Sequence, residues 1–533
     1  MIDVLIIGSG ISGLTAALNA KKNNTNVLVL SKTYPTHSQS VQAQGGINAV
    51  LYEDDDSVET HIEDTYKGSC KLANKENIKL MCENAKETIN WLDSIGVPFN
   101  RTCDNKIAQR KFGGTKKIRT CYSSDYTGLK ILHTLYDRCI KEEIDFLNEH
   151  MLLNLIVENN QCYGAIVLDI KNGEIKEYLS KTTILATGGY AGIYHNHTTN
   201  SYSNSGDGIA VAFNAGVKLS NMEFVQFHPT TLENSNVLIS ESARGEGGYL
   251  LDQNMNRFID ELKSRDEVSR AIYEKIQRNE KVYLDLRHLG IEKIKKLMPQ
   301  ERTLAINYAN IKIENELLPI TPASHYSMGG IKTDINTKTN IKNLFACGEC
   351  AEASIHGANR LGGNSLLEIV TFGKVAGLNA SNEAKDVIQN QSISNQLNEN
   401  KKELDEIYKI ENKINFYAEK ERIGDLLFNN LGLFRTQSQM QIALNELKIL
   451  KENLKHIGID DKSKIYNKNL IDLLEFRNMI EVSILVCLSA INRTESRGSH
   501  FRLDYPNQNI NFVKNSFIQK DSSDIIANFE DIQ

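Results

Sequence analysis

The strongest constraint on the fold lies at the start of the chain, where a short apolar run enters a glycine-rich turn. Asp3-Val-Leu-Ile-Ile7 is typical of a buried parallel strand, Gly8-Ser-Gly10-Ile-Ser-Gly13 of a tight turn, and residues 14–20 of a helix of small residues. A second strand is expected at 26–30. In such a βαβ unit the three glycines permit the turn, let the backbone approach a pyrophosphate, and allow close helix–strand packing. We therefore predict an α/β fold with a Rossmann-like dinucleotide-binding domain.

The residues after the second strand indicate which dinucleotide is bound. An acidic residue there would bind the ribose of NAD, whereas this chain has Ser31-Lys32. A second glycine turn, Gln42-Ala-Gln44-Gly45-Gly46, follows, and backbone amides in such a turn can approach a flavin ring. Residues 183–189 and 344–349 again run from an apolar strand into glycines. This recurrence favours FAD, bound by one domain that is assembled from distant pieces of the chain.

The composition is that of a multidomain globular protein. The 533 residues carry a net charge of −6 with acidic and basic residues interleaved, so nothing indicates nucleic-acid binding. Nine scattered cysteines, an odd number, fit a reduced intracellular protein. The first strand leaves no room for a signal peptide, and apolar runs such as 482–490 are shorter than the ~20 residues that cross a bilayer. We expect a cytoplasmic chain that reaches a membrane only through partner subunits.

Charged residues set among glycines between 228 and 266 form a second informative stretch. It contains His228-Pro-Thr230, Glu241-Ser-Ala-Arg244-Gly-Glu-Gly-Gly248 and Arg265-Asp266. Taken singly, a His-Pro pair is most often a turn and an Arg-Asp pair a surface feature or a helix start. When they occur together, tight glycine turns let their charged side chains converge on one point, and arginine can form bidentate hydrogen bonds with a carboxylate. The stretch therefore predicts a binding site for a small carboxylate.

Eight longer strings, spread over nearly the whole chain, carry a family pattern. They are Ala43-Gln-Gly-Gly-Ile-Asn48, Gln109-Arg-Lys-Phe-Gly-Gly114, Leu132-His-Thr-Leu-Tyr136, Phe224-Val-Gln-Phe-His-Pro-Thr230, Arg244-Gly-Glu-Gly-Gly248, His325-Tyr-Ser-Met-Gly-Gly330, His356-Gly-Ala-Asn-Arg-Leu-Gly-Gly-Asn-Ser-Leu-Leu367 and Glu495-Ser-Arg-Gly-Ser-His500. In this order they resemble the flavoprotein subunits of succinate dehydrogenase and fumarate reductase, a family related to L-aspartate oxidase.

The resemblance implies how the chain is divided into domains. A Rossmann-like two-dinucleotide FAD-binding domain is expected to be interrupted by an α+β capping domain for the substrate and followed by a C-terminal helical domain. The FAD-binding domain is expected to comprise residues 1–221 and 334–385, on either side of the capping domain at 222–333, with the helical domain at 386–505 and a tail at 506–533. The helical spacing of apolar residues at 444–454 agrees independently.

The resemblance also implies the chemistry. In the family, a hydride passes between flavin N5 and one alkene carbon of fumarate while a proton passes to the neighbouring carbon. Arg265 resembles the proton donor, and Glu241 with Arg244 resembles the relay that supplies it, with His228 also in the catalytic set. Free arginine has a pKa above ~12, so such a donor needs burial, nearby cations and a carboxylate relay.

Two further sets of contacts follow from the same resemblance. The residues expected at the substrate are His228, Ser240, Glu241, His325, Arg360 and Phe112. The residues expected at FAD are Gly8, Gly10, Gly13, Ser31, Lys32, Gln44, Gly45, Gly46, Asp207, Glu349, Arg360, Ser365 and Leu366.

Other reactive side chains receive simpler interpretations. Cys347-Gly-Glu-Cys350 has redox or metal spacing, but no second pair or histidine follows at ligand spacing, so we predict a structural pair and no metal site. Three histidines in polar loops are predicted to be solvated or to flank FAD, namely His37, His195 and His197. His133 and His356 are predicted to be structural or near the flavin.

One position departs from the family pattern. Succinate dehydrogenases and membrane-bound fumarate reductases usually attach FAD through a histidine six residues before the first glycine of the Gln-Gly-Gly turn, and here that residue is Gln39. His37 is two residues earlier, which is roughly 7 Å away along an extended strand. We predict noncovalent FAD, which in this family favours fumarate reduction over succinate oxidation and also matches L-aspartate oxidase.

Alternative functions remain open. The ten residues between Thr230 and Glu241 favour the fumarate and succinate enzymes, whereas Ile320-Thr-Pro-Ala-Ser-His325 and the overall length resemble L-aspartate oxidase, which converts aspartate to iminoaspartate. A noncatalytic flavin electron-transfer subunit is the other alternative. Because the chain carries no iron–sulfur ligand set, electrons are expected from a partner: an iron–sulfur subunit with a membrane anchor, or a thiol-oxidising subunit.

Overall fold

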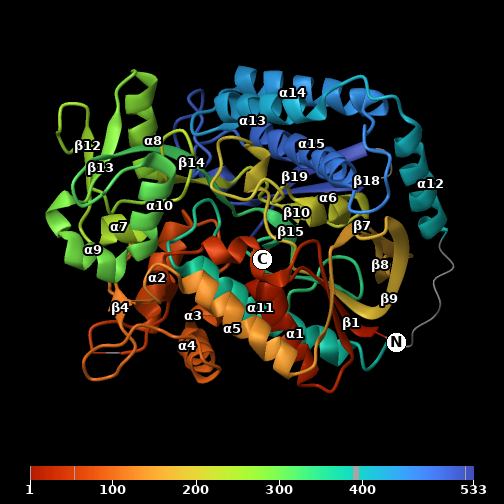
Figure 1. The fold of residues 1–533 in the computed structure, drawn as a ribbon, viewed down its shortest axis with the longest axis horizontal. Helices are drawn as coiled ribbons and strands as arrows, with labels where there is room; N and C mark the ends of the chain where they lie inside the picture. The colour runs from red at the N-terminus through yellow and green to blue at the C-terminus, as the bar shows by residue number, and fades with distance from the viewer. Residues whose placement is uncertain (1, 53, 388–394, 522–523, 533) are drawn as a thin grey trace.

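The structure is a computed structural model that describes residues 2–52, 54–387, 395–521 and 524–532. Figure 1 shows three regions: the N-terminal strands and helices with α11, a group of strands and helices from the middle of the chain, and a layer of late helices. The first and second of these regions, with contributions from the third, position the candidate site.

The largest sheet has the strand order β6-β2-β1-β9-β8-β7, with β16 also paired to β9. Five of these strands are parallel, while β8 and β7 run antiparallel to their neighbours. The bounds are Ile2–Ile7 for β1, Val27–Ser31 for β2, Asp145–Asn148 for β6, His150–Glu158 for β7, Gln161–Asp169 for β8, Glu174–Leu185 for β9 and Leu344–Ala346 for β16. The pairing of β16 with β9 joins segments far apart in the sequence, as the recurring glycine turns predicted.

Helix α1 (Ile11–Lys21) follows the first glycine turn and is buried along nearly its whole length. It packs against α11 (Asn364–Glu383) and against α5 (Thr127–Lys141). Contact between α1 and α11 is close, because a Cβ atom on Gly377 would lie 2.2 Å from the carbonyl oxygen of Ala16. This packing places the residues just before α11 beside the first glycine turn.

A smaller sheet supports the second glycine turn. Its order is β3-β5-β4, and the helices around it precede α5 in the chain. The bounds are Ile47–Asn48 for β3, Gln109–Arg110 for β4, Thr120–Cys121 for β5, Val58–Gly68 for α2, Lys75–Glu83 for α3 and Ala85–Ser94 for α4. This sheet fixes the backbone directly after residues 44–46.

The capping region, here residues 225–327, is an α+β insertion (green in Figure 1). Its sheet has the antiparallel order β11-β14-β13-β12 and its own apolar core around Val268, Ile272 and Leu284. The bounds are Val225–Leu232 for β11, Tyr249–Asp252 for β12, Val282–Asp285 for β13, Leu318–Ser327 for β14, Glu241–Gly245 for α7, Arg265–Gln277 for α8, Ile291–Leu297 for α9 and Pro299–Ala309 for α10.

A fourth sheet in the described ranges connects the end of the chain to its middle. Its order is β17-β15-β10-β18-β19, so the last hairpin pairs with the short strand that precedes the capping region. The bounds are Leu219–Ser220 for β10, Gly330–Lys332 for β15, Ala351–Glu352 for β17, Asn515–Asp521 for β18 and Asp524–Glu530 for β19. This pairing was not predicted, because residues 506–533 are polar and contain no strong strand pattern.

The late helices form a bundle on the side of β10 and α6 (Figure 1). The bounds are Asp207–Asn214 for α6, Gln396–Lys409 for α12, Phe416–Leu431 for α13, Gln437–Asn453 for α14 and Lys468–Asn492 for α15. Helix α14 contains most of the 444–454 stretch in which helical spacing was predicted. No described helix combines the length and the apolar character that spanning a membrane requires. The predicted α/β class with an α+β insertion and a helical C-terminal region is confirmed, whereas the exact domain boundaries stay a proposal.

Candidate active site

One elongated cavity runs from the first glycine turn to the capping region. Its lining changes character along its length, from glycines and hydroxyls at α1 to histidines, arginines and a glutamate at β11, α7 and α8. The lining includes Gly8, Gly10, Ser31, Lys32, Gln44, Gly45, Gly46, Phe112, Asp207, His228, Ser240, Glu241, Arg265, His325, Glu349, Arg360, Ser365 and Leu366. A dinucleotide site and a cluster of charged groups therefore share one cavity.

The first glycine turn has the geometry that a bound pyrophosphate requires. Gly8 has a φ of 114°, and a Cβ atom on it would lie 2.0 Å from the carbonyl oxygen of Ala186. A Cβ atom on Gly13 would lie 2.0 Å from the carbonyl oxygen of Gly8, so this glycine serves the packing of α1. A Cβ atom on Gly10 would meet only side-chain atoms, the nearest being Ser40 Oγ at 3.4 Å, so no backbone obstructs the N-terminus of α1 there. Such a helix end favours an anion.

Several buried polar atoms along the cavity have no partner among the described residues. These atoms are Ser38 Oγ, Gln44 Oε1 and Thr187 Oγ1, and their residues all line the cavity. Buried polar groups in native proteins are nearly always hydrogen-bonded, so these three atoms are suited to contact a polar ligand. Together with the unobstructed backbone at Gly10, they show that the residues present fit a dinucleotide such as FAD.

Lys32 and Asp207, both predicted to contact the cofactor, are held together at the end of the cavity. Lys32 Nζ lies 2.5 Å from Asp207 Oδ2 and 2.8 Å from Glu475 Oε1. Glu475 belongs to α15, so the late helices contribute to this end of the cavity. The sequence did not single out Glu475, because a lone glutamate in an apolar helix carries no motif.

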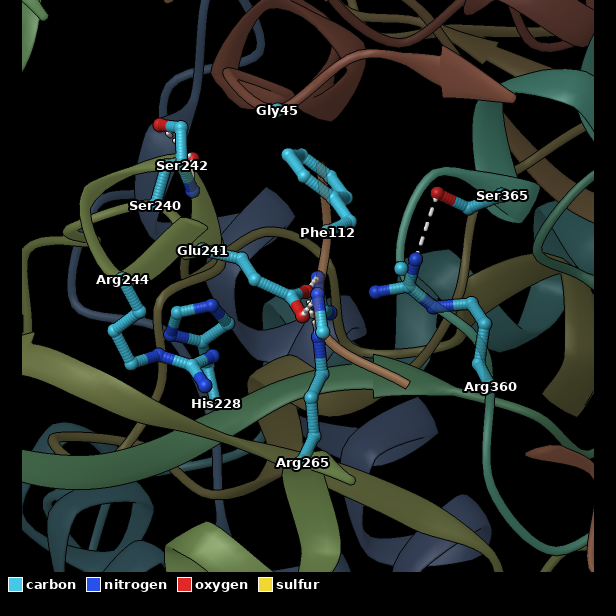
Figure 2. A network of polar contacts seen from close by, with 12 residues as sticks. Gly45, Phe112, His228, Ser240, Glu241, Ser242, Arg244, Arg265, Arg360 and Ser365 are labelled. Atoms are coloured by element: carbon cyan, nitrogen blue, oxygen red, sulfur yellow. Dashed lines mark hydrogen bonds and ion pairs between the residues drawn. The ribbon is translucent and has the colours of Figure 1, made fainter. Parts of the chain in front are cut away.

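The second glycine turn is covered by an aromatic ring. A Cβ atom on Gly45 would lie 2.7 Å from Cζ of Phe112, so the ring packs directly on the turn. Figure 2 shows Phe112 between this turn and the charged groups of the capping region. The ring therefore covers one side of the second glycine turn.

Glu241 and Arg265 form the central ion pair of the site. Arg265 Nε and Nη2 donate to Glu241 Oε2 at 2.8 and 2.6 Å, while the amide of Gly113 donates to Oε1 at 2.9 Å. Arg265 Nη1 also donates to Gln226 Oε1 at 3.1 Å. Burial alone raises the pKa of Glu241, but Arg265 and then Arg244 outweigh it and hold this pKa below its usual value. Glu241 is therefore a carboxylate at neutral pH.

Arg244 lies next to this pair but does not line the cavity. Its side chain is almost wholly buried, and Nη1 donates to the carbonyl oxygen of Glu261 at 2.5 Å. Nε and Nη2 have no partner among the described residues. Burial lowers the pKa of Arg244, although Glu241 nearby opposes this shift.

Two histidines face each other at the same end of the cavity. The ring centres of His228 and His325 are 5.0 Å apart, and His325 Nδ1 lies 2.8 Å from Thr199 Oγ1. Burial, together with the charge of Arg265, lowers the pKa of both rings well below its usual value. Both imidazoles are therefore neutral at neutral pH and can exchange hydrogen bonds with a carboxylate.

Arg360 approaches from the opposite side in Figure 2. Nη1 donates to Ser365 Oγ at 2.9 Å, and the guanidinium lies 4.2 Å from the ring centre of Tyr326. Burial, with a contribution from Arg265, lowers the pKa of Arg360 to about 9. Its buried Nε has no partner in the described part of the chain, so the group can receive an anionic ligand.

Comparison with known proteins decides the family. The model described as "FAD binding domain" matches residues 3–366, and "Fumarate reductase flavoprotein C-term" matches residues 420–533. The chain is 38% identical to the 8-methylmenaquinol:fumarate reductase flavoprotein subunit of Wolinella succinogenes, over 98% of this chain and 89% of that protein. It belongs to the fumarate reductase and succinate dehydrogenase flavoprotein family.

Other members of the family agree. The succinate dehydrogenase flavoprotein subunit of Rickettsia bellii is 36% identical over 95% of this chain and 91% of that protein. A solved structure of quinol-fumarate reductase with menaquinol molecules matches with a TM-score of 0.96 and 33% identity, over all of this chain and 98% of that chain. The resemblance predicted from the sequence is confirmed, as are the fold and the class of FAD-dependent oxidoreductase. The alternatives of L-aspartate oxidase and a noncatalytic subunit are not favoured.

The cavity brings together all but two of the residues predicted for this family's site. The exceptions, Gly13 and Arg244, pack behind it. Among the residues that were not predicted, two contact the predicted side chains directly: Thr199, which lies beside His325, and Gln226, which accepts from Arg265. Gln226 could have been found, since it stands two residues before His228 on the same strand.

The prediction for one histidine was wrong. His133 is exposed on α5 and lies away from the cavity, because it occupies the solvent face of that helix. His356 is buried, with Nε2 3.3 Å from Glu368 Oε2, and His37 lines the cavity. His195 and His197 are partly exposed and lie outside the lining.

The cysteine pair is buried beside the cavity. Cys350 Sγ lies 3.3 Å from the carbonyl oxygen of Leu185 and 3.4 Å from that of Cys347, and both thiols are free. Burial raises the pKa of both thiols above its usual value, which makes them poor nucleophiles. These contacts fit a structural interpretation of the pair.

The segment that contains His37 and Gln39 was interpreted above as an extended strand, and this was wrong. Pro35–His37 and Gln39–Gln42 form two short 3₁₀ turns, η1 and η2. A proline at 35 favours such a turn over a strand. Gln39 lines the cavity, and its Oε1 accepts a hydrogen bond from the amide of Ser201 at 2.9 Å.

Proposed function

We propose that this chain reduces fumarate to succinate and that FAD is bound without a covalent link. The observation that supports the proposal most directly is the ion pair of Arg265 and Glu241, buried in the same cavity as the two glycine turns. A proton-carrying group is thus placed beside the site that fits FAD. Relatives named for fumarate reduction also support this substrate.

Three groups are proposed to bind the two carboxylates of fumarate. Arg360 provides a positive charge for one of them, while the neutral rings of His228 and His325 offer hydrogen bonds to the other. His228 and Arg360 are almost completely buried and His325 is partly buried, so a carboxylate bound here gains contacts that water screens little. Binding in this way fixes the orientation of the double bond against Arg265.

Arg265 is proposed to protonate one alkene carbon. Two of its nitrogens bind Glu241 and a third binds Gln226, and the guanidinium retains further N–H groups that can face the substrate. The cations of Arg244 and Arg360 would stabilise the negative charge that develops on the substrate. Glu241, with oxygens bound to both Arg265 and Gly113, is proposed to return the proton.

The residues proposed to hold FAD follow from the fit of the cavity. Gly10 and the N-terminus of α1 would accept the pyrophosphate, and Gln44, Gly45 and Glu349 would lie along the ring system. Bound FAD supplies the hydride for the reduction. Gln39 in place of a histidine supports a noncovalent site and, with it, fumarate reduction as the direction.

A partner subunit is proposed to deliver the electrons. The relatives are named as flavoprotein subunits, and one is named for a menaquinol. We therefore infer an iron–sulfur subunit and a membrane anchor that bring this chain to a membrane, in preference to a thiol-oxidising subunit.

The proposal is tested by assaying the purified holoprotein with a reduced dye and fumarate. Fumarate-dependent oxidation of the dye is expected, and Arg265→Ala should abolish it while FAD stays bound. Arg278→Ala, an exposed arginine after the other end of α8, is the matched control and should leave the rate unchanged. Oxygen-dependent formation of iminoaspartate from L-aspartate, with no turnover of fumarate, would overturn the proposal.

A further inference from the structure

A buried pair of carboxylic acids lies where the capping region meets the dinucleotide-binding region of the chain. Asp125 stands two residues before α5, and Glu301 lies in the first turn of α10. The amide of Glu301 donates to Asp125 Oδ2 at 2.9 Å, so Asp125 caps a helix of the other region. Both side chains are completely buried.

The side chain of Glu301 leads from this contact to the active site. Ser242 Oγ donates to Glu301 Oε1 at 2.9 Å, and the hydroxyls of Ser242 and Ser240 are 2.8 Å apart. Ser240 is the N-cap of α7, the helix that begins with Glu241, and it lines the cavity. Two hydrogen bonds thus connect Glu301 to the residue that precedes the proposed relay carboxylate.

The charges around the pair do not balance if both acids are ionised. Arg110 faces Asp125 and Glu301, and its Nη2 also donates to the carbonyl oxygens of Ser124, at 3.0 Å, and Gly45. Tyr122 and Glu246 are the other titratable groups that act on Arg110. One guanidinium therefore compensates one carboxylate, and a second buried carboxylate would remain unpaired.

Two oxygens of the pair have no partner among the described residues, namely Asp125 Oδ1 and Glu301 Oε2. A proton held by the pair would turn one of these carboxyl groups into a donor and remove the excess charge. Burial, with Asp125 as the next cause, raises the pKa of Glu301 to about 8, and burial raises the pKa of Asp125 to about 6. Glu301 is thus the acid that keeps the proton at neutral pH.

We propose that Glu301 is a positioning residue for fumarate reduction: Asp125 caps its main-chain amide, and its side chain, as a neutral acid, binds the Ser240–Ser242 pair and thereby holds Glu241 and the capping region against the dinucleotide-binding region. The inference rests on the proposed function only where it concerns the effect of Glu301 on the rate of fumarate reduction. The linkage itself is a property of the protein without substrate.

The sign of the pH dependence follows from the two states of Glu301. A solvent-exposed glutamate has a pKa of about 4.3, whereas Glu301 in the linked arrangement has a pKa of about 8. Between these values the linked arrangement holds one more proton than the exposed group, so rising pH weakens it. The arrangement is lost as the pH passes through about 8.

The first experiment measures the linkage without fumarate, in the FAD-loaded protein. The infrared difference spectrum between the wild type and Glu301→Gln at neutral pH should contain the carbonyl band of one protonated, buried carboxylic acid. Glu349 and Glu352, whose pKa values burial raises to about 7, contribute equally to both proteins and cancel. The protection factors of the amides of residues 240–248, which correct for the base-catalysed rise of intrinsic exchange with pH, should fall in the wild type as the pH rises through about 8 and should stay level in Glu301→Gln, whose amide mimics the neutral acid. Absence of the band, or identical exchange profiles for the two proteins, would overturn the proposal whatever the substrate is.

The second experiment measures turnover. Between neutral pH and a pH of about 9, kcat for fumarate should fall in the wild type by up to about tenfold relative to Glu301→Gln, whose amide does not titrate. Glu301→Ala should have a low kcat at every pH. Gln at position 301 should restore the rate, whereas adding Asp125→Asn to Glu301→Ala should not. Glu292→Gln, an exposed glutamate on α9, is the control and should retain the wild-type profile. A profile shared by the wild type and Glu301→Gln would contradict the positioning role.

Discussion

Arg265 and Glu241 are the first residues of two different helices, α8 and α7, and their side chains meet in a contact of 2.6 Å between Nη2 and Oε2. A helix N-terminus stabilises the negative charge of Glu241 but disfavours the positive charge of Arg265. Arg265 therefore depends on Glu241 for its counter-charge at a position where both side chains are buried. This dependence determines what substitutions at either position should do.

Arg265→Lys tests the need for a guanidinium at this position. Lysine cannot bind one carboxylate oxygen through two nitrogens while also reaching Gln226, so we expect kcat for fumarate to fall by about 10²–10⁴-fold. Flavin absorbance should show the same FAD content as the wild type. Arg278→Lys is the control. A rate within threefold or so of the wild type would remove Arg265 from the proposed role of proton donor.

Glu241→Gln tests the effect of the relay carboxylate on stability. The pKa of Glu241 is lowered in the folded protein, so its contribution to the free energy of unfolding is present above its unfolded pKa of about 4.3 and is lost as the pH falls through the folded pKa. At neutral pH the variant should be less stable by about 3–5 kcal/mol, because Arg265 stays buried without its partner.

The measurement is unfolding by urea at neutral and at acidic pH. The difference between the variant and the wild type should shrink on acidification, whereas Glu267→Gln, a half-exposed control on α8, should change stability little at either pH. A difference that stays constant with pH would mean that Glu241 is not ionised in the folded protein.

Comparing Gly10→Ala with Gly13→Ala distinguishes a glycine needed for FAD binding from a glycine needed for the stability of the fold. The Cβ atom of Ala at 10 meets nothing closer than 3.4 Å, so the apoprotein should keep its stability while losing FAD affinity by about tenfold or more. At 13 the new Cβ would lie 2.0 Å from a carbonyl oxygen, so the fold itself should be destabilised. Thermal unfolding of the apoproteins and titration with FAD distinguish the two cases. Equal loss of stability in both variants would contradict the assignment of Gly10 to the pyrophosphate.

The sequence predicts best those regions of the site that local pattern determines. The turn at Gly8–Gly13 and the turn at Gly45–Gly46 depend on glycine within a few residues, and both line or support the cavity as predicted. Family strings likewise identified the charged residues of the capping region. Position 133 was misinterpreted because a family string does not reveal which face of a helix is exposed.

Contacts between distant segments could not be predicted in this way. Glu475 reaches Lys32 from α15, and Glu301 reaches Asp125 across the boundary of the capping region. Neither glutamate stands in a motif. Glu475 can be recognised as important only because it is buried beside the charge of Lys32, and Glu301 only because it is buried beside a second acid. The hairpin of β18 and β19 was missed for a related reason, since its pairing with β10 depends on a partner strand about 300 residues earlier.

The mode of flavin attachment gives the last prediction. Gln39 occupies the position of the family's histidine, and its amide is not a nucleophile; its Oε1 is instead bound by the amide of Ser201. Acid precipitation of the holoprotein should therefore release all the yellow flavin into the supernatant. His37 lines the cavity and carries a nucleophilic imidazole two residues before Gln39, so His37→Ala is the informative companion. Flavin that stays in the wild-type pellet but leaves the His37→Ala pellet would identify His37 as the point of attachment and would make succinate oxidation the better assignment.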